Sequence, residues 1–298
     1  MDDGMEVQMD MRKSFWILLA GTAFGSSVVM TRFAVAEIPP IDLVAVRLGA
    51  AAALFVPTLL ILRLRLPREP RAWVDMAVVG ATTAAPLVAF TFALQWISAG
   101  VLTVFLALIP LFTAILAHRL VAGERLDGGK TAGLVLAFAG VLAILLTRTS
   151  GLGASATAGV TRGHVLALAG TISSAYAGVH TRLHLRQIPS PVVTAGQLVT
   201  GFLFVLPLSM TLGTFEPALV EWRTWLAALY TGVIGSFLAF WVVVILAQRY
   251  GATASSLPAY LLPIVSTALG AALLGEQIEL PMLGGGALIL LGLYLANR

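Results

Sequence analysis

The side chains in this sequence that could do chemistry are few and lie far apart. The chain has four histidines and no cysteine, which excludes disulfides, cysteine–zinc sites and thiol catalysis. His180 and His184 have the i, i+4 spacing of a metal-binding pair, but Thr181 stands where a helical zinc-protease motif has its glutamate. We therefore interpret the two histidines as a hydrogen-bonded pair near a membrane interface. We predict no metal, no cofactor and no catalytic residue.

Acidic side chains avoid the interior of the apolar segments. All 14 aspartates and glutamates fall in termini, loops or segment ends, as Glu37, Asp42, Glu69 and Asp75 illustrate. A carboxylate at the centre of a bilayer is costly and marks a proton or cation relay. The absence of one argues against such a relay. It also means that a small molecule bound among these segments would be neutral or zwitterionic, because a strongly charged ligand would need a fixed counter-charge.

Arg47 is a basic residue about one turn inside an apolar segment, and Gln197 lies 150 residues later in another. We expect Arg47 to reach the interface or to pair with Asp42. The alternative is that it attracts an anionic group of the substrate.

Prolines interrupt several of the same segments. Each one removes a helical hydrogen bond and leaves a carbonyl free. We interpret them as kinks that gate the protein or bind substrate, and the alternative is a packed kink whose carbonyl is satisfied by neighbours. The four prolines are Pro86, Pro110, Pro258 and Pro263.

Ten apolar segments of bilayer-spanning length carry these residues. The chain is 59% hydrophobic and 11% charged, whereas soluble domains are about 25% charged, and its mean hydropathy is +0.96. A spanning helix needs about 20 mostly apolar residues. We therefore predict an all-α integral membrane protein with transmembrane helices at residues 14–36, 43–62, 74–97, 99–120, 130–147, 163–181, 191–213, 225–247, 252–274 and 282–296.

Basic residues gather on one side of these ten segments, as in the loop that contains Arg63, Arg65, Arg68 and Arg71. Because cytoplasmic loops carry an excess of Lys and Arg, this bias predicts that both termini are cytoplasmic. Helical spans place the protein in a bacterial inner membrane.

The chain contains an internal repeat. Thr31-Arg32 and Ile38-Pro39 recur 150 residues later, and Gly123-Glu124, Gly133 and Gly140 recur 152 residues later. The repeat divides the chain into a cytoplasmic segment 1–13, a first repeat 14–148, a linker 149–162 and a second repeat 163–298. Since each repeat holds five spans, the second copy enters the membrane from the opposite face. The prediction is two inverted five-helix repeats, a transporter architecture.

Two matched stretches, 100–126 and 251–278, resemble the EamA repeat of the drug/metabolite transporter superfamily. The shared features are a mid-helix proline (Pro110, Pro263) and a Gly-Glu pair at the helix end (Gly123-Glu124, Gly275-Glu276). We interpret the two glutamates as helix-capping or ion-pairing groups. The resemblance covers almost the whole chain and implies export of amino acids, drugs or other metabolites. It also implies a cavity lined by the first, third, fourth, sixth, eighth and ninth helices.

Hydroxyl and aromatic side chains on these helices are the candidates for the cavity lining. Aromatic faces contact apolar side chains and ammonium groups, and hydroxyls with free backbone dipoles can hold a zwitterion. The alternative for each residue is packing or lipid contact. The candidates are Trp16, Ser26, Ser27, Phe90, Ser173, Tyr176, Phe237, Trp241 and Tyr260.

The leading hypothesis is facilitative export of neutral amino acids, including aromatic ones, or of similar metabolites, by alternating access. The alternative is a multidrug or other metabolite exporter with proton coupling, although the buried carboxylate that four-helix multidrug exporters carry in their first helix is absent here. A distant alternative is an intramembrane enzyme. The expected partners are a small-molecule substrate and membrane lipid, not nucleic acid, and we expect a monomer or weak homodimer.

Overall fold

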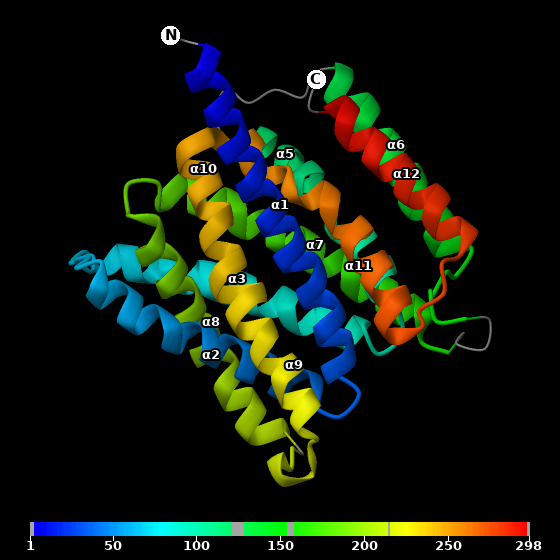
Figure 1. Ribbon diagram of the computed structural model, residues 1–298, viewed down its shortest axis with the longest axis horizontal. Coiled ribbons are helices and arrows are strands. Elements are labelled where there is room, and N and C mark those ends of the chain that lie inside the picture. Colours follow the sequence, from blue (N-terminus) through cyan, green and yellow to red (C-terminus); the bar gives the residue numbers. More distant parts are fainter. Residues whose placement is uncertain (1–2, 121–127, 154–157, 214, 297–298) are drawn as a thin grey trace.

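The computed structural model describes residues 3–120, 128–153, 158–213 and 215–296, and in these ranges the protein is helical without a strand (Figure 1). The elements follow one another along the chain with short connections. They are α1 (Asp3–Ala34), α2 (Pro40–Ile61), α3 (Pro70–Ala93), α4 (Ala99–Leu106), α5 (Ile109–Leu120), α6 (Gly128–Leu146), α7 (Val160–His184), α8 (Ser190–Leu212), a 3-10 turn η1 (Pro217–Leu219), α9 (Trp222–Gly232), a π-helical segment η2 (Val233–Leu238), α10 (Ala239–Ser256), α11 (Pro258–Leu274) and α12 (Leu280–Ala296).

These elements agree with the predicted number of ten helices, because α4 with α5, and α9 with η2 and α10, each act as one interrupted helix. The predicted end of the eighth helix at residue 247 is wrong, since α10 continues to Ser256. Six helices in the described part of the chain are long and apolar enough to cross a membrane. Three more contain shorter apolar stretches, Val135–Leu146, Pro258–Leu274 and Leu280–Gly292. The remaining helix, α7, has 25 residues but does not reach the same apolarity. The number of helices therefore agrees with the prediction, but their apolar stretches differ in length.

The four prolines act in two different ways. Pro86 and Pro263 lie inside the continuous helices α3 and α11, and both are buried. Pro110 is the second residue of α5, and α4 ends four residues before it. Pro258 is the first residue of α11, directly after the break at Leu257. Proline fits the first turn of a helix, where its missing N–H needs no intrahelical partner, and both Pro110 and Pro258 lie in the first turn after a break, although Leu257 itself keeps right-handed helical angles.

The packing of the bundle is formed by helices from both halves of the chain. In Figure 1, α1 lies beside α10 and α11, and α6 and α12 lie together along one edge of the molecule. A Cβ added at Gly285 would lie 2.8 Å from the carbonyl oxygen of Gly140, and one at Gly292 would lie 2.4 Å from that of Gly133. Glycine therefore allows the backbones of α6 and α12 to approach closely, as small residues do in membrane helix pairs.

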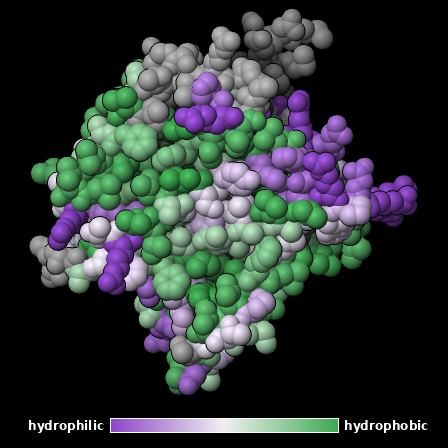
Figure 2. All heavy atoms as spheres, turned by 180° about the vertical axis from the view of Figure 1, so that it is seen from behind, coloured by the Kyte–Doolittle hydropathy of each residue, from purple (hydrophilic) through white to green (hydrophobic). Residues whose placement is uncertain are grey.

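The outer surface is largely apolar, which suits a lipid environment. Figure 2 shows one face on which hydrophobic residues dominate and hydrophilic side chains gather in separate clusters. Large exposed side chains include Leu60, Ile61, Leu146, Met210 and Leu280, each more than 70% exposed. An exposed apolar surface of this extent marks a membrane or protein contact.

Candidate functional site

A buried guanidinium lies between α1, α2 and η2. The side chain of Arg47, on α2, is 6% exposed. Its Nε donates to the hydroxyl of Ser236 at 2.7 Å, and its Nη2 donates to the carbonyl of Gly235 at 3.2 Å. Its Nη1 donates more weakly to Thr31 on α1, at 3.4 Å. All three acceptors are neutral, so the positive charge is solvated by dipoles rather than by a counter-ion.

The expectation that Arg47 reaches the interface or pairs with Asp42 is wrong. Arg47 is buried, and the carboxylate of Asp42 accepts a hydrogen bond from Ser209 on α8. Five residues on an α-helix correspond to about 140° of rotation, so the two side chains leave opposite faces of α2. No carboxylate of the described residues forms a salt bridge with Arg47.

The π-helical segment η2 supplies two of the three acceptors. It interrupts an otherwise α-helical stretch and carries Gly235 and Ser236, both buried. Single π turns within α-helices are frequent at functional sites. Here the altered turn presents one backbone carbonyl and one hydroxyl to the same guanidinium.

Ser26 and Ser27, two predicted cavity residues, lie at this site. The hydroxyl of Ser27 is buried and has no hydrogen-bond partner among the described residues. A Cβ at Gly235 would lie 1.8 Å from the Ser27 hydroxyl and 3.3 Å from Nη2 of Arg47. The hydroxyl of Ser26 bonds with that of Tyr230 on α9 at 2.8 Å. Glycine is therefore required at 235, and an unpartnered hydroxyl faces the same space as the guanidinium.

An aromatic cluster lies on the neighbouring part of the same helices. Phe237 and Trp241, also predicted cavity residues, have ring centroids 5.5 Å apart, and Phe237 lies 4.7 Å from Phe55 on α2. Trp16 packs more distantly along α1, with Val242 and Leu246 of α10. We call the set Ser26, Ser27, Thr31, Arg47, Tyr230, Gly235 and Ser236 the Arg47 site.

Three of the other predicted cavity residues, Phe90, Ser173 and Tyr176, lie on α3 and α7, whereas Tyr260 lies on α11. The hydroxyl of Ser173 donates to the carbonyl of Thr82 at 3.3 Å. The ring of Phe90 packs directly on Gly170, so that a Cβ added there would clash with it. Tyr176 is 37% exposed, and Tyr260 packs half-buried on the main core. The predicted set therefore divides between two regions.

Four residues of the Arg47 site were not predicted from the sequence: Thr31, Gly235 and Ser236, which bond Arg47, and Tyr230, which bonds Ser26. The one available indication was Arg47 itself, a cation within an apolar segment. Its acceptors on η2 lie 188 and 189 residues away in the chain, and no local pattern marks them.

Glu276 lies outside the membrane-spanning segments, between α11 and α12. Its Oε1 accepts the backbone N–H of Ala99 at 2.9 Å, which confirms the expected capping role at the first turn of α4. The second oxygen is buried and finds no hydrogen-bond partner in the part of the chain that the structure describes. Burial raises the pKa of the Glu276 carboxyl, and the N–H bonds from α4 and the charge of Arg32 oppose this rise in pKa. Its counterpart Glu124 lies outside the described residues.

Comparisons with known proteins agree with this architecture. The model of the EamA-like transporter family matches residues 11–146 and again residues 161–298. A probable amino-acid metabolite efflux pump of Salmonella typhimurium strain LT2 is 24% identical over 295 residues, covering 96% of this chain and 95% of that protein. An uncharacterized transporter of Archaeoglobus fulgidus is 24% identical over 294 residues, covering 95% and 98%.

A solved crystal structure, described only as that of a protein, has the same fold. It superposes with a TM-score of 0.68 at 22% identity and covers 95% of this chain and 96% of its own. Two copies of one family domain cover nearly the whole sequence. The apolar helices show that the chain is a multi-pass membrane protein. The chain belongs to the EamA-like transporter family.

Proposed function

We propose that this protein exports neutral amino acids, or similar small metabolites with a carboxylate, across the bacterial inner membrane by alternating access. The observation that carries the proposal is the buried charge of Arg47, bound only by neutral groups in the described part of the chain. A buried cation without a counter-ion costs several kcal/mol. A substrate carboxylate that binds there would supply the missing charge.

The geometry of the Arg47 site suits a carboxylate. A guanidinium has five N–H donors, and three of its nitrogens make one bond each to described residues. Two N–H groups are therefore left for another acceptor, and the buried hydroxyl of Ser27 offers a further donor. A planar guanidinium binds a carboxylate through two parallel hydrogen bonds.

The neighbouring aromatic cluster suits the rest of an amino acid. Phe55, Phe237 and Trp241 form a polarizable apolar surface, which tolerates side chains of different size and attracts an ammonium group through its ring faces. The relative described as a probable amino-acid metabolite efflux pump supports the same substrate class. Cationic drugs fit less well, because Arg47 would repel them.

The paired packing of the helices supports an inverted repeat and a rocking mechanism. Helix α1 of the first copy packs on α11 and on α9–η2–α10 of the second copy. The matching helix α7 of the second copy packs on α5 and on α3 of the first copy. The matching pairs α2 with α8, and α6 with α12, contact each other directly. Such paired contacts are expected when a pseudo-two-fold axis relates the halves. The charge bias supports cytoplasmic termini.

The experiment is flux of labelled phenylalanine or threonine from proteoliposomes, with and without a pH gradient. We expect saturable flux that does not depend on the gradient. Phenylalanine should compete, whereas phenylalaninamide, which lacks the carboxylate, should not. A requirement for the gradient would contradict facilitative transport. Equal competition by the amide would contradict carboxylate binding, and absence of flux from folded protein would contradict the substrate class.

A further inference from the structure

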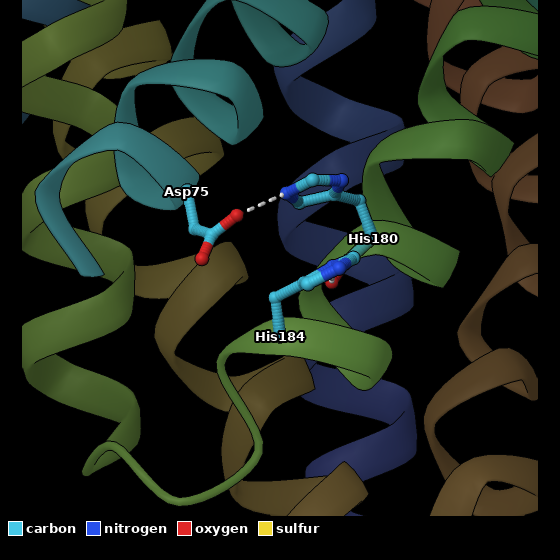
Figure 3. Close-up of side chains that lie close together, drawn as sticks. All are labelled: Asp75, His180 and His184. Carbon is cyan, nitrogen blue, oxygen red and sulfur yellow. Dashed lines mark hydrogen bonds and ion pairs between the residues drawn. The ribbon is translucent and has the colours of Figure 1, made fainter. Parts of the chain in front are cut away.

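Three ligand-type side chains meet where α3 begins and α7 ends. Figure 3 shows Asp75 on α3 facing His180 and His184 on α7. The Nε2 of His180 lies 3.0 Å from a carboxylate oxygen of Asp75, and the two imidazole rings stack with centroids 4.2 Å apart. One ligand atom from each of the three residues lies within 4.8 Å of the other two. Both histidines are hydrogen-bonded, and the structure adds a carboxylate that the prediction of no metal did not take into account.

We propose that Asp75, His180 and His184 form a binding site for a divalent transition metal of the Zn²⁺ class, which links α3 to α7. Two imidazoles and one carboxylate are a recurrent three-residue set for Zn²⁺, with the fourth position open to water. The harder ions Mg²⁺ and Ca²⁺ prefer sites built from oxygen.

An outer hydrogen bond prepares His184 as a ligand. The Nδ1 of His184 lies 3.2 Å from the backbone carbonyl of His180, so it carries the proton and leaves the lone pair on Nε2. Such outer hydrogen bonds orient ligating imidazoles in metal sites. A bound metal would replace the hydrogen-bonding proton between the Nε2 of His180 and the Oδ1 of Asp75, two atoms that lie 3.0 Å apart.

The separation of the ligand atoms fits an ion after a small adjustment. Zinc–nitrogen and zinc–oxygen bonds of about 2.0–2.2 Å place neighbouring ligand atoms roughly 3.0–3.5 Å apart. The His180–Asp75 distance already lies in this range. His184 is exposed, so its side chain can rotate to complete the site without disturbing the packed core.

The cluster is open to solvent through a cavity of about 600 Å³. Asp75 and His184 line it, which gives an ion a path to the ligands. The cavity is lined by acidic and by basic side chains. The acidic ones are Glu69 and Asp75, and the basic ones include Arg71, Arg182 and Arg186. The arginines weaken the attraction for a cation, so we expect reversible binding, weaker than in a structural zinc site.

The position of the site gives metal binding a mechanical consequence. Helices α3 and α7 belong to different copies of the family domain and pack along each other. The charge bias predicts that this end of the bundle is cytoplasmic. A metal held by both helices would resist their separation, and it would therefore slow a transport cycle of the kind proposed above. Only this consequence rests on the proposed function.

The first test measures metal binding without transport. Untagged protein in detergent is titrated with Co²⁺, followed by its visible absorption, and then with Zn²⁺ in competition with a chromophoric chelator. We expect one ion per chain, and affinity at least about tenfold lower in His180→Ala, His184→Ala and Asp75→Asn. The control His118→Ala removes a histidine on α5 and should bind as the unmodified protein does.

Two results would overturn the metal site. One is the absence of any binding by protein whose size-exclusion profile is that of a folded chain. The other is equal affinity in His118→Ala and His184→Ala, which would place the ion elsewhere. Because His184 is exposed, its replacement should leave the fold intact, and the melting temperature without metal checks this.

The second test measures the link between α3 and α7. Saturating Zn²⁺ should raise the melting temperature and lower substrate flux in the unmodified protein, and should do neither in His184→Ala. Binding of Zn²⁺ with unchanged substrate flux would contradict the mechanical link between α3 and α7, but not the metal site itself. Absence of flux in every variant, with binding intact, would contradict the proposed transport function and not the metal site.

Discussion

The two halves of the chain place different polar groups at matching positions. Arg47 on α2 donates to the hydroxyl of Ser236 at 2.7 Å, and Gln197 on α8 donates to that of Thr83 on α3 at the same distance. The hydroxyl acceptors are alike, but the donor on α2 is charged and the one on α8 is neutral. The helix opposite Arg47 contains the π segment η2, whereas α3 is a continuous α-helix.

The two copies of the family domain therefore share helices but differ in the charge of the polar group at this position. A neutral amide to hydroxyl bond satisfies both groups and needs no ligand. A guanidinium held by neutral acceptors is satisfied as a donor but not as a charge. Under the proposed function, the side of the bundle where α1 and α2 meet η2 is therefore the one that binds an anionic group of the substrate.

Replacing Arg47 by glutamine makes the two halves alike and is expected to have the largest effect. Loss of one partner of a buried charge pair costs about 2–5 kcal/mol, so flux should fall by at least about 30-fold. Arg47→Lys should restore only part of it, because an ammonium lacks the two-pronged geometry. The matched control Gln197→Met removes a neutral bond, and its flux should stay close to that of the unmodified protein. Full flux in Arg47→Gln would show that the charge difference has no role.

Gly235→Ala tests the same site through packing. The added Cβ would lie 1.8 Å from the hydroxyl of Ser27, so the helices must shift at a cost of roughly 1–3 kcal/mol. The melting temperature should fall, and the double variant Ser27→Gly with Gly235→Ala should recover part of the loss. Gly178→Ala on α7 is the control, since nothing lies within 4 Å of the added Cβ. Equal melting temperatures for the two single variants would contradict close packing at Gly235.

Pro110→Ala tests whether the break between α4 and α5 moves during transport. Alanine would allow one continuous helix across residues 107–109, and we expect flux to fall several-fold with the protein still folded. Pro57→Ala is the control, because Pro57 lies inside α2 with an exposed side chain. Unchanged flux in Pro110→Ala would rule out a hinge at this position.

The sequence predicts the helices well because the bilayer imposes a local rule. A spanning helix satisfies its own backbone, so each apolar stretch of suitable length is recognisable by itself. The close approach of α6 and α12 is also local in origin, since it depends on small residues such as Gly140 and Gly285. Composition and spacing were sufficient for this part of the fold.

The partners of the polar groups could not be predicted in the same way. Asp75 meets His180 across 105 residues, and Ser236 meets Arg47 across 189. These contacts depend on how the helices cross, and apolar spans of similar composition can pack in many arrangements. The π segment is equally hidden, because its sequence VIGSFL differs little from an ordinary helix.

Glu276→Gln should have the smallest effect and concerns the contact between the halves. The carboxyl caps α4 from the α11–α12 connection, and burial raises its pKa. A raised pKa means that the folded protein prefers the protonated form. The stabilisation of the folded protein by the protonated carboxyl is therefore complete below the ordinary glutamate pKa, about 4.3, and is lost as pH rises through the higher folded value.

Glutamine at position 276 can still accept the Ala99 N–H but cannot ionise. The melting temperature of Glu276→Gln should therefore equal or exceed that of the unmodified protein at neutral pH, and the difference should vanish on acidification. A lower melting temperature at neutral pH would mean that the negative charge stabilises α4 by more than its burial costs.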